Sequence, residues 1–201
     1  MAKLKGPLFS LGASQQIGKA LVYFPWKGLN VVREYVIPSN PKSPAQQTQR
    51  GYMSTAVAAV HTAMADAAVP MLAVDFSAYG LWASVVQRAT TWFNQAVRNF
   101  IDQLHDGLGG IVYGNGLVTP GVGTATLAID DGTSTVTAGD FRFGTSKTAL
   151  INSQVAVVAA TNISVTIPAL TAGTKYYIQF VPSAPAGAIG ALSGIYHCTP
   201  T

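Results

Sequence analysis

The chain is poor in charged residues. Asp, Glu, Lys and Arg make up 10% of its 201 residues, against roughly a quarter in an ordinary soluble domain, and 49% of the residues are hydrophobic. Its single cysteine, Cys198, excludes a disulfide within the chain. No apolar run reaches the roughly 18 residues that a membrane-spanning helix needs. The low charge therefore predicts a surface covered by neighbouring copies or other partners, and no membrane span.

The few charges that are present are unevenly placed. Seven of the twelve Lys and Arg residues lie in the first 50 residues beside one acid, Glu34, a local balance of +6. Residues 51–109 carry two basic residues against four acids, and residues 110–201 carry three against three. A basic arm on a nearly neutral body predicts docking onto an acidic surface. The first residues lack the apolar stretch of a secretory signal, so we expect synthesis in the cytoplasm without classical export.

Residues 17–26 and 30–37 are rich in β-branched and aromatic residues, which predicts a β-hairpin with its turn at residues 27–30. Both faces of its first strand are apolar, and Pro25 favours a sheet edge or a bulge. Such a hairpin either forms an assembly interface or is covered by helices of its own subunit. For an interface, aromatic and cationic side chains are the expected anchors: Tyr23, Trp26, Lys27, Arg33, Tyr35, Arg50 and Tyr52.

Two helical segments are expected after a proline-rich connector at residues 38–44. Ser-Pro followed by Gln at position 46 has the spacing of a capping box and predicts a helix from residue 44 to about 68. A second apolar stripe runs from Asp75 or Ser77 to about residue 105. Thr90 or Thr91 can divide this stretch by capping a new helix, so the sequence predicts two or three helices. Gly107 supplies a helix end.

Residues 110–201 differ in composition, with Thr, Val, Ala and Gly in place of helix formers. Short alternating runs between turn residues predict six or seven strands of an antiparallel β-sandwich. The runs are 124–129, 136–143, 154–159, 163–167, 175–181 and 192–198. The predicted fold class is thus α+β, with a hairpin and helical domain over residues 1–109 and a sandwich over residues 110–201.

One segment of this sandwich resembles a known fold family. Leu170-Thr171-Ala172-Gly173-Thr174-Lys175-Tyr176 is similar to the turn and tyrosine corner that open the sixth strand of fibronectin type III domains. The resemblance implies an immunoglobulin-like or fibronectin type III-like sandwich in which the Tyr176 hydroxyl bonds to nearby backbone. The tryptophan usual in an early strand of that family is absent, because all three Trp residues lie before residue 93.

The sequence offers little for catalysis or metal binding. It has no Gly-x-Ser-x-Gly elbow and no phosphate-binding loop, and His61, His105 and His197 fall in separate predicted elements. One cysteine and three scattered histidines do not support a zinc site. Asp-Asp-Gly at residues 130–132, with Asp140, is more typical of a hairpin turn than of a calcium site. We expect no enzymatic activity, no cofactor and no metal.

Residues 6–52 resemble a second group of proteins. The ordered positions are Gly18, Val22, Trp26-Lys27-Gly28, Arg33, Pro38, Asn40-Pro41, Gln46 and Gln49-Arg50. They are similar to a motif in small uncharacterised proteins of tailed bacteriophages and prophages. The resemblance implies a virion structural protein that self-assembles or decorates a capsid or tail, with homo-oligomer or other virion proteins as partners and the virion as its location.

Two other functions remain open at this point. A carbohydrate- or cell-surface-binding module, with a host-surface glycan as ligand, would need exposed aromatics on the sandwich: Tyr113, Phe141, Phe143, Tyr176, Tyr177, Phe180 and Tyr196. A nucleic-acid-binding packaging protein would combine basic and aromatic side chains of the N-terminal region: Lys19, Lys27 and Arg33 with Tyr23, Trp26 and Tyr35. The modest net charge of +4 makes nucleic acid the weaker expectation.

Overall fold

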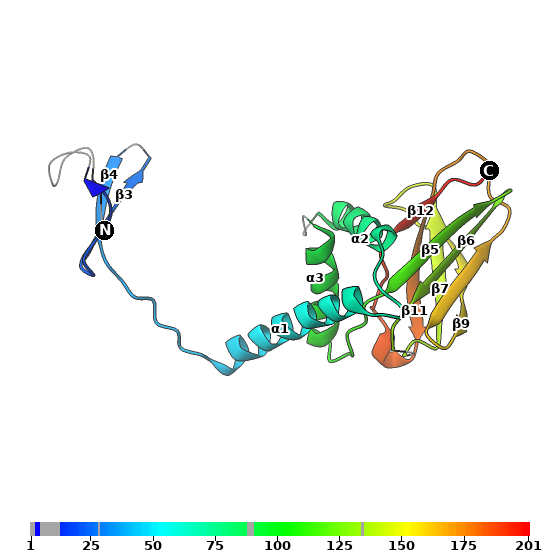
Figure 1. The fold of residues 1–201 in the computed structure, drawn as a ribbon, viewed down its shortest axis with the longest axis horizontal. Coiled ribbons are helices and arrows are strands. Elements are labelled where there is room, and N and C mark those ends of the chain that lie inside the picture. The colour runs from blue at the N-terminus through cyan, green and yellow to red at the C-terminus, as the bar shows by residue number, and fades with distance from the viewer. Residues whose placement is uncertain (1–2, 5–12, 28, 88–90, 134) are drawn as a thin grey trace. The chain divides into compact units, whose positions relative to one another are not determined.

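The computed structural model describes residues 3–4, 13–27, 29–87, 91–133 and 135–201. The chain forms two compact units, Met1–Ser43 and Pro44–Thr201 (Figure 1). The predicted boundary after residue 109 falls inside the second unit, because the helices and the sandwich share their cores. Ala78 from a helix lies in the sandwich core, and Ile195 from the sandwich lies in the helical core.

The described residues of the first unit form an antiparallel sheet in the order β1-β2-β3-β4. Its strands are Lys3–Leu4, Ala13–Ile17, Leu21–Trp26 and Leu29–Glu34. The predicted hairpin is confirmed as β3 and β4, which pair from Leu21 with Glu34 to Trp26 with Leu29. Its turn is shorter than predicted: Lys27 adopts a φ of 49°, residue 28 lies outside the described residues, and Asn30 already pairs with Pro25. The strands β1 and β2 were not predicted.

The second unit begins with α1 (Pro44–Ala65), α2 (Ala73–Val86) and α3 (Trp92–His105). The expected division of the second helical stretch is confirmed, because Thr91 caps α3 by accepting a hydrogen bond from the Asn94 N–H at 3.2 Å. Asp75 lies in the first turn of α2 instead of before it. Gly107 follows α3 with a φ of 74°, which is the left-handed conformation of a helix end.

The remaining strands form two antiparallel sheets, β5-β6-β10-β9 and β12-β11-β7-β8 (Figure 1). The strands are Gly114–Gly121, Thr124–Asp130, Ala138–Gly144, Asn152–Val155, Val157–Ala159, Asn162–Ile167, Tyr176–Ala184 and Tyr196–Cys198. Both sheets contribute to one core. Its fully buried side chains include Leu127, Ile129 and Ile163 from the first sheet and Phe141, Ile178 and Phe180 from the second. The antiparallel layered architecture is therefore as predicted at the level of α+β class.

Three details of the sheets differ from the sequence prediction. The run 154–159 is divided, because β8 pairs with β7 in one sheet and β9 pairs with β10 in the other. The strand β5 was missed, because the first predicted run begins at residue 124. Asp131 and Gly132 do not form a hairpin turn but connect β6 of one sheet to β7 of the other. There the Asp131 carboxylate accepts the N–H of Val136 at 2.9 Å and holds the connection.

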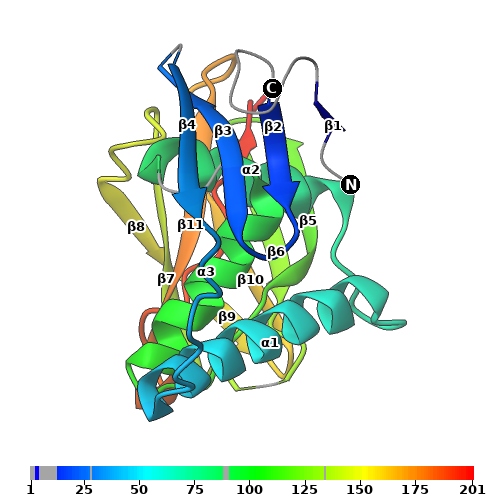
Figure 2. The ribbon, with the colours of Figure 1, turned by 90° about the vertical axis from the view of Figure 1, so that its left-hand side faces the viewer.

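The helices pack on one another and on the edge of the sandwich. Helix α3 contacts both α1 and α2 (Figure 2), and α2 contacts β5 and β12. The helical core includes Val60, Tyr79 and Phe100 together with Ile195, which immediately precedes β12. The N–H of Ile195 donates to the backbone oxygen of Ala78 at 3.0 Å. Among the described residues, no helix is both long and apolar enough to cross a bilayer.

Candidate functional site

The first unit combines exposed large apolar side chains with positive charge. Trp26 and Leu29 pair across β3 and β4, and their side chains are 60% and 70% exposed. The unit has six Lys and Arg residues against Glu34 alone, a balance of +5, whereas Pro44–Thr201 has six against seven. Exposed apolar groups gathered on a charged surface are typical of an interaction site.

The strand register places several of these residues on one face of the sheet. Directly opposite residues in antiparallel strands project to the same side, and alternate residues along a strand share a side. The guanidinium of Arg33 lies over the ring of Phe24, 5.3 Å from its centroid, a cation–π contact that keeps a cation beside apolar side chains. We call this surface the Trp26 face; its members are Val22, Phe24, Trp26, Leu29, Val31 and Arg33.

The seven predicted anchor residues do not form one surface in the structure. Trp26 and Arg33 share the Trp26 face, and Lys27 follows at the exposed turn. Tyr23 projects to the opposite side and is 4% exposed, so its ring is not part of the accessible surface. Tyr35 is half-buried after β4, where its N–H bonds to the Ala20 oxygen at 2.8 Å.

The other two anchors, Arg50 and Tyr52, lie on α1 and so belong to the second unit. Arg50 is exposed and Tyr52 is half-buried. Of the 22 residues of α1, Ala56 and Val60 are the buried ones, and Met53 is 51% exposed. This helix therefore presents most of its surface to solvent.

The connector between the units adds to the exposed apolar surface. Residues 35–43 form no helix or strand, and Pro38 and Pro41 restrict the residues before them to extended conformations. Val36 and Ile37 are 70% and 71% exposed. Together with Trp26 and Leu29 of the Trp26 face, they are among the most exposed large apolar side chains described in the first unit.

The histidines take part in separate contacts. The His61 ring lies 5.4 Å from the Phe93 ring, and the His197 ring lies 6.5 Å from the Tyr177 ring. His105 Nδ1 is 3.9 Å from a carboxylate oxygen of the adjacent Asp106. Within the described part of the chain, no three His, Cys, Asp or Glu side chains come together as a metal site would require.

The aromatic residues of the sandwich pack in or against its core, except Tyr177, which packs against the helical core. Tyr113, Phe141, Phe180 and Tyr196 are buried, and Phe143, Tyr176 and Tyr177 are half-buried. The Phe180 ring packs against those of Tyr113 and Phe141 at centroid distances of 5.6 and 5.0 Å. The accessible aromatic platform that a glycan-binding surface needs is therefore not formed by these seven residues.

A buried carboxylate joins the helices to the sandwich. Asp75 is fully buried, and its Oδ1 accepts the hydroxyl of Tyr196 at 2.6 Å. Its Oδ2 accepts the N–H of Leu72 at 2.7 Å, and the N–H of Gly116 lies within 3.2 Å of both oxygens. Burial raises the pKa of Asp75, although these hydrogen bonds oppose the shift. The sequence pattern predicts Asp75 only as a helix cap. No pattern indicates its hydrogen-bond partners, Gly116 on β5 and Tyr196 on β12.

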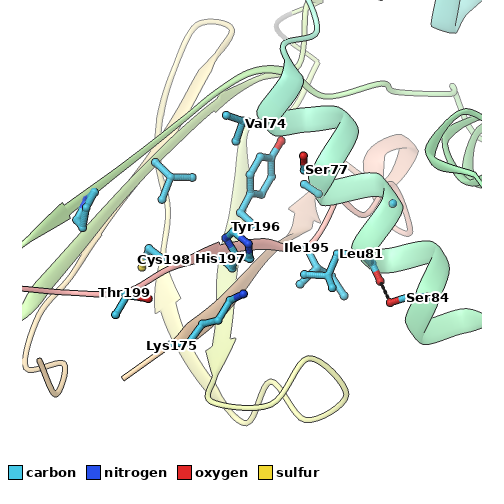
Figure 3. Close-up of a pocket in the computed structure, with 14 residues that line it drawn as sticks. Val74, Ser77, Leu81, Ser84, Lys175, Ile195, Tyr196, His197, Cys198 and Thr199 are labelled. Carbon is cyan, nitrogen blue, oxygen red and sulfur yellow. Dashed lines mark hydrogen bonds between the residues drawn. The ribbon is translucent and has the colours of Figure 1, made fainter. Parts of the chain in front are cut away.

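A groove of about 710 Å³ opens beside this carboxylate, between α2, β5 and β12 (Figure 3). The helix contributes Val74, Ser77, Ala78, Gly80, Leu81 and Ser84; β5 contributes Val118 and Pro120; Lys175 and residues 195–199 complete the lining. Sequence reasoning missed this groove, because it depends on the docking of α2 onto two strands that are distant in the chain.

Comparisons with known proteins add no functional assignment. Neither the scan against protein-family models nor the search of curated proteins found a match to this chain. A proposal for its function therefore depends on the geometry above and on the motif of residues 18–50.

Proposed function

We propose that this chain is a bacteriophage virion structural protein that self-assembles or decorates a capsid or tail through its first unit. The observation that carries the proposal is the Trp26 face, an exposed apolar surface on a unit with a balance of +5. Trp26, Lys27 and Arg33, which belong to the phage-like motif, lie at or beside this face. The partner we expect is an acidic surface of a virion protein or of another copy.

The two properties of the face would act at different stages of docking. Positive charge increases the rate of encounter with an acidic partner and is screened by salt. Apolar contact then stabilises the complex by about 25 cal/mol per Å² of area removed from water. Trp26 and Arg33 are the residue types that most often dominate interface energetics. Salt should therefore weaken the association without abolishing it.

In this proposal the second unit carries a fibronectin type III-like module. Strands β5-β6-β10-β9 follow the order A-B-E-D of immunoglobulin-type sheets, and β12-β11-β7 follow the order G-F-C. The Tyr176 hydroxyl accepts the N–H of Thr171 at 3.2 Å, which supports a tyrosine corner before β11. Phe141 on β7 is fully buried in the core between the two sheets. Such a module would face outward from an assembly.

The test uses the full chain and a double variant, Trp26→Ser with Leu29→Ser. Sedimentation velocity over a range of concentrations and salt should show association of the wild type that the double variant loses. Val122→Ser is the matched control, because Val122 is an 87% exposed apolar residue of the second unit. A wild-type chain that stays monomeric at high concentration and also fails to bind purified virion proteins would contradict the proposal.

Nucleic-acid packaging is a second candidate, favoured by the position of Trp26 and Arg33 on one face of a basic unit. Base stacking on an aromatic ring beside cations is how many proteins hold single strands. Quenching of Trp26 fluorescence by single-stranded DNA, with a steep loss of affinity as salt rises, would support this candidate. Association of the purified chain in the absence of nucleic acid supports the structural role instead.

A further inference from the structure

We propose that the groove between α2, β5 and β12 binds a free amphiphile that has an apolar body and one carboxylate. This inference is independent of the assembly role of the first unit, because the groove belongs entirely to Pro44–Thr201. Its volume of about 710 Å³ lies within the range of roughly 300–1,000 Å³ typical of small-molecule sites. Its walls would contact the apolar body of the ligand, and its rim would contact the carboxylate.

The walls of the groove are largely apolar. Helix α2 contributes Val74 and Leu81, and β5 contributes Val118 and Pro120. Val74 is 43% exposed although it faces this lining, so a ligand would remove apolar surface from water. An alkyl chain or a hydrophobic ring fits such walls, because apolar contact does not demand matched hydrogen bonds.

The rim of the groove is cationic. Lys175 lines it beside His197 (Figure 3), and the Lys175 amine lies 5.5 Å from the centroid of the Tyr177 ring. A second amine lies at the α2 side of the groove, because Lys147 Nζ donates to the hydroxyl of Ser84 on α2 at 3.1 Å. In the described part of the chain, neither lysine forms a salt bridge. Asp75 is not part of the lining, so the rim favours an anion.

The groove is held in shape without a ligand. The hydrogen bond between Asp75 and Tyr196 fixes the start of α2 to β12, and the bond from Ile195 N–H to Ala78 fixes the next turn. At Gly194 an added Cβ would come within 2.7 Å of the Ala78 side chain, which shows how closely the segment before β12 approaches α2. A preformed site loses less conformational freedom on binding. The binding of a small carboxylate therefore needs no rearrangement of the fold.

The experiment titrates the full chain with decanoate and follows binding by calorimetry and by backbone NMR shifts. Decan-1-ol and decyltrimethylammonium are the matched neutral and cationic probes. We expect one decanoate per chain, with shifts in α2, β5 and β12, and weaker binding of both other probes. Lys175→Gln should weaken decanoate binding about three- to tenfold and leave decan-1-ol unchanged.

Two further variants separate the groove from general charge effects. Arg142→Gln removes an exposed cation of β7 outside the lining and should leave decanoate binding unchanged. Ser77→Trp fills the groove from an exposed helix position and should abolish binding while circular dichroism and the urea midpoint stay near those of the wild type. If Ser77→Trp fails to fold, the Lys175 and Arg142 variants decide the result.

Several outcomes would overturn the inference. They are no decanoate binding, equal affinity for the three probes, shifts outside the groove, or equal losses in the Lys175 and Arg142 variants. Vesicles of anionic phospholipid distinguish a free amphiphile from a membrane lipid. A free ligand predicts that the chain does not sediment with such vesicles; sedimentation that Lys175→Gln abolishes would contradict the assignment.

Discussion

The hydroxyl of Tyr196 donates a 2.6 Å hydrogen bond to Oδ1 of Asp75 across 121 residues of sequence. Both side chains are buried, one on the last strand of the sandwich and the other in the first turn of α2. A buried polar group that loses its hydrogen-bond partner is costly to the fold. This pair therefore joins α2 to the sandwich, together with the apolar packing that the two cores share.

Removing this hydroxyl should destabilise the second unit. In Tyr196→Phe the ring still fills its place, but the buried carboxylate loses a donor, and we expect a loss of about 1.5–3 kcal/mol in the free energy of unfolding. Urea denaturation followed by tryptophan fluorescence measures it. Tyr52→Phe on α1, where the ring is half-buried, is the control with a change below about 0.5 kcal/mol. Equal stability of the two variants would contradict the role of the pair.

The stability contributed by Asp75 should fall as pH rises. Burial raises its folded pKa above the ordinary value of 3.8, so above that value the native state holds more protons than the unfolded chain. The free energy of unfolding then decreases with pH until the folded pKa is passed. Asp75→Asn cannot titrate. The difference in stability between wild type and Asp75→Asn should therefore be largest in acid and smaller at neutral pH.

Asp66 provides a control, because its contribution to the free energy of unfolding should change with pH in the opposite direction. Its carboxylate accepts the N–H groups of Val69 and Ala68, which lower its pKa below 3.8. Its contribution is therefore present above that value and is lost as pH falls through the lower folded pKa. Urea titrations of Asp66→Asn and Asp75→Asn across the acid range should give opposite slopes relative to wild type. Slopes of the same sign would show that the environment of one carboxylate is not as described.

Local sequence patterns predicted most of the individual elements but not their arrangement. The capping pattern before α3, the glycine after it and the hairpin β3–β4 depend on neighbouring residues, and all three are confirmed. The strand β5 was missed because Gly114, Asn115 and Gly116 have turn chemistry locally. In the fold, Gly116 is required there by contact with Asp75, a residue 41 positions away.

The Trp26 face and the groove also could not be predicted from local sequence patterns. Alternation predicted that β3 is apolar on both sides, but only strand pairing shows that Trp26 and Arg33 share a face while Tyr23 lies on the other. The groove has no sequence signature, because Leu81, Val118 and Lys175 belong to three separate elements. Composition and periodicity report on the local chain, and these sites form from contacts between distant segments.

Gly116 should not tolerate a side chain. A Cβ at this position would lie 2.3 Å from Oδ1 of Asp75 and 2.7 Å from the Tyr196 ring, so Gly116→Ala must displace the buried pair. We expect a loss of about 1–3 kcal/mol in the free energy of unfolding, as for other overpacked sites. Gly109→Ala is the control, because a Cβ there meets nothing within 4 Å. Thermal and urea unfolding of both variants measure the difference, and a stable Gly116→Ala would contradict the close approach.

The contact between Tyr176 and Thr171 is a separate test of the corner before β11. The Tyr176 hydroxyl accepts the backbone N–H of Thr171 at 3.2 Å, and this donor lowers the pKa of Tyr176. Tyr176→Phe keeps the ring and removes the acceptor, so we expect a small decrease in the free energy of unfolding. Tyr177→Phe removes a hydroxyl one residue further along the strand and should change stability less. Amide hydrogen exchange should accelerate at Thr171 in the first variant alone, and unchanged exchange there would show that the hydroxyl does not hold the corner.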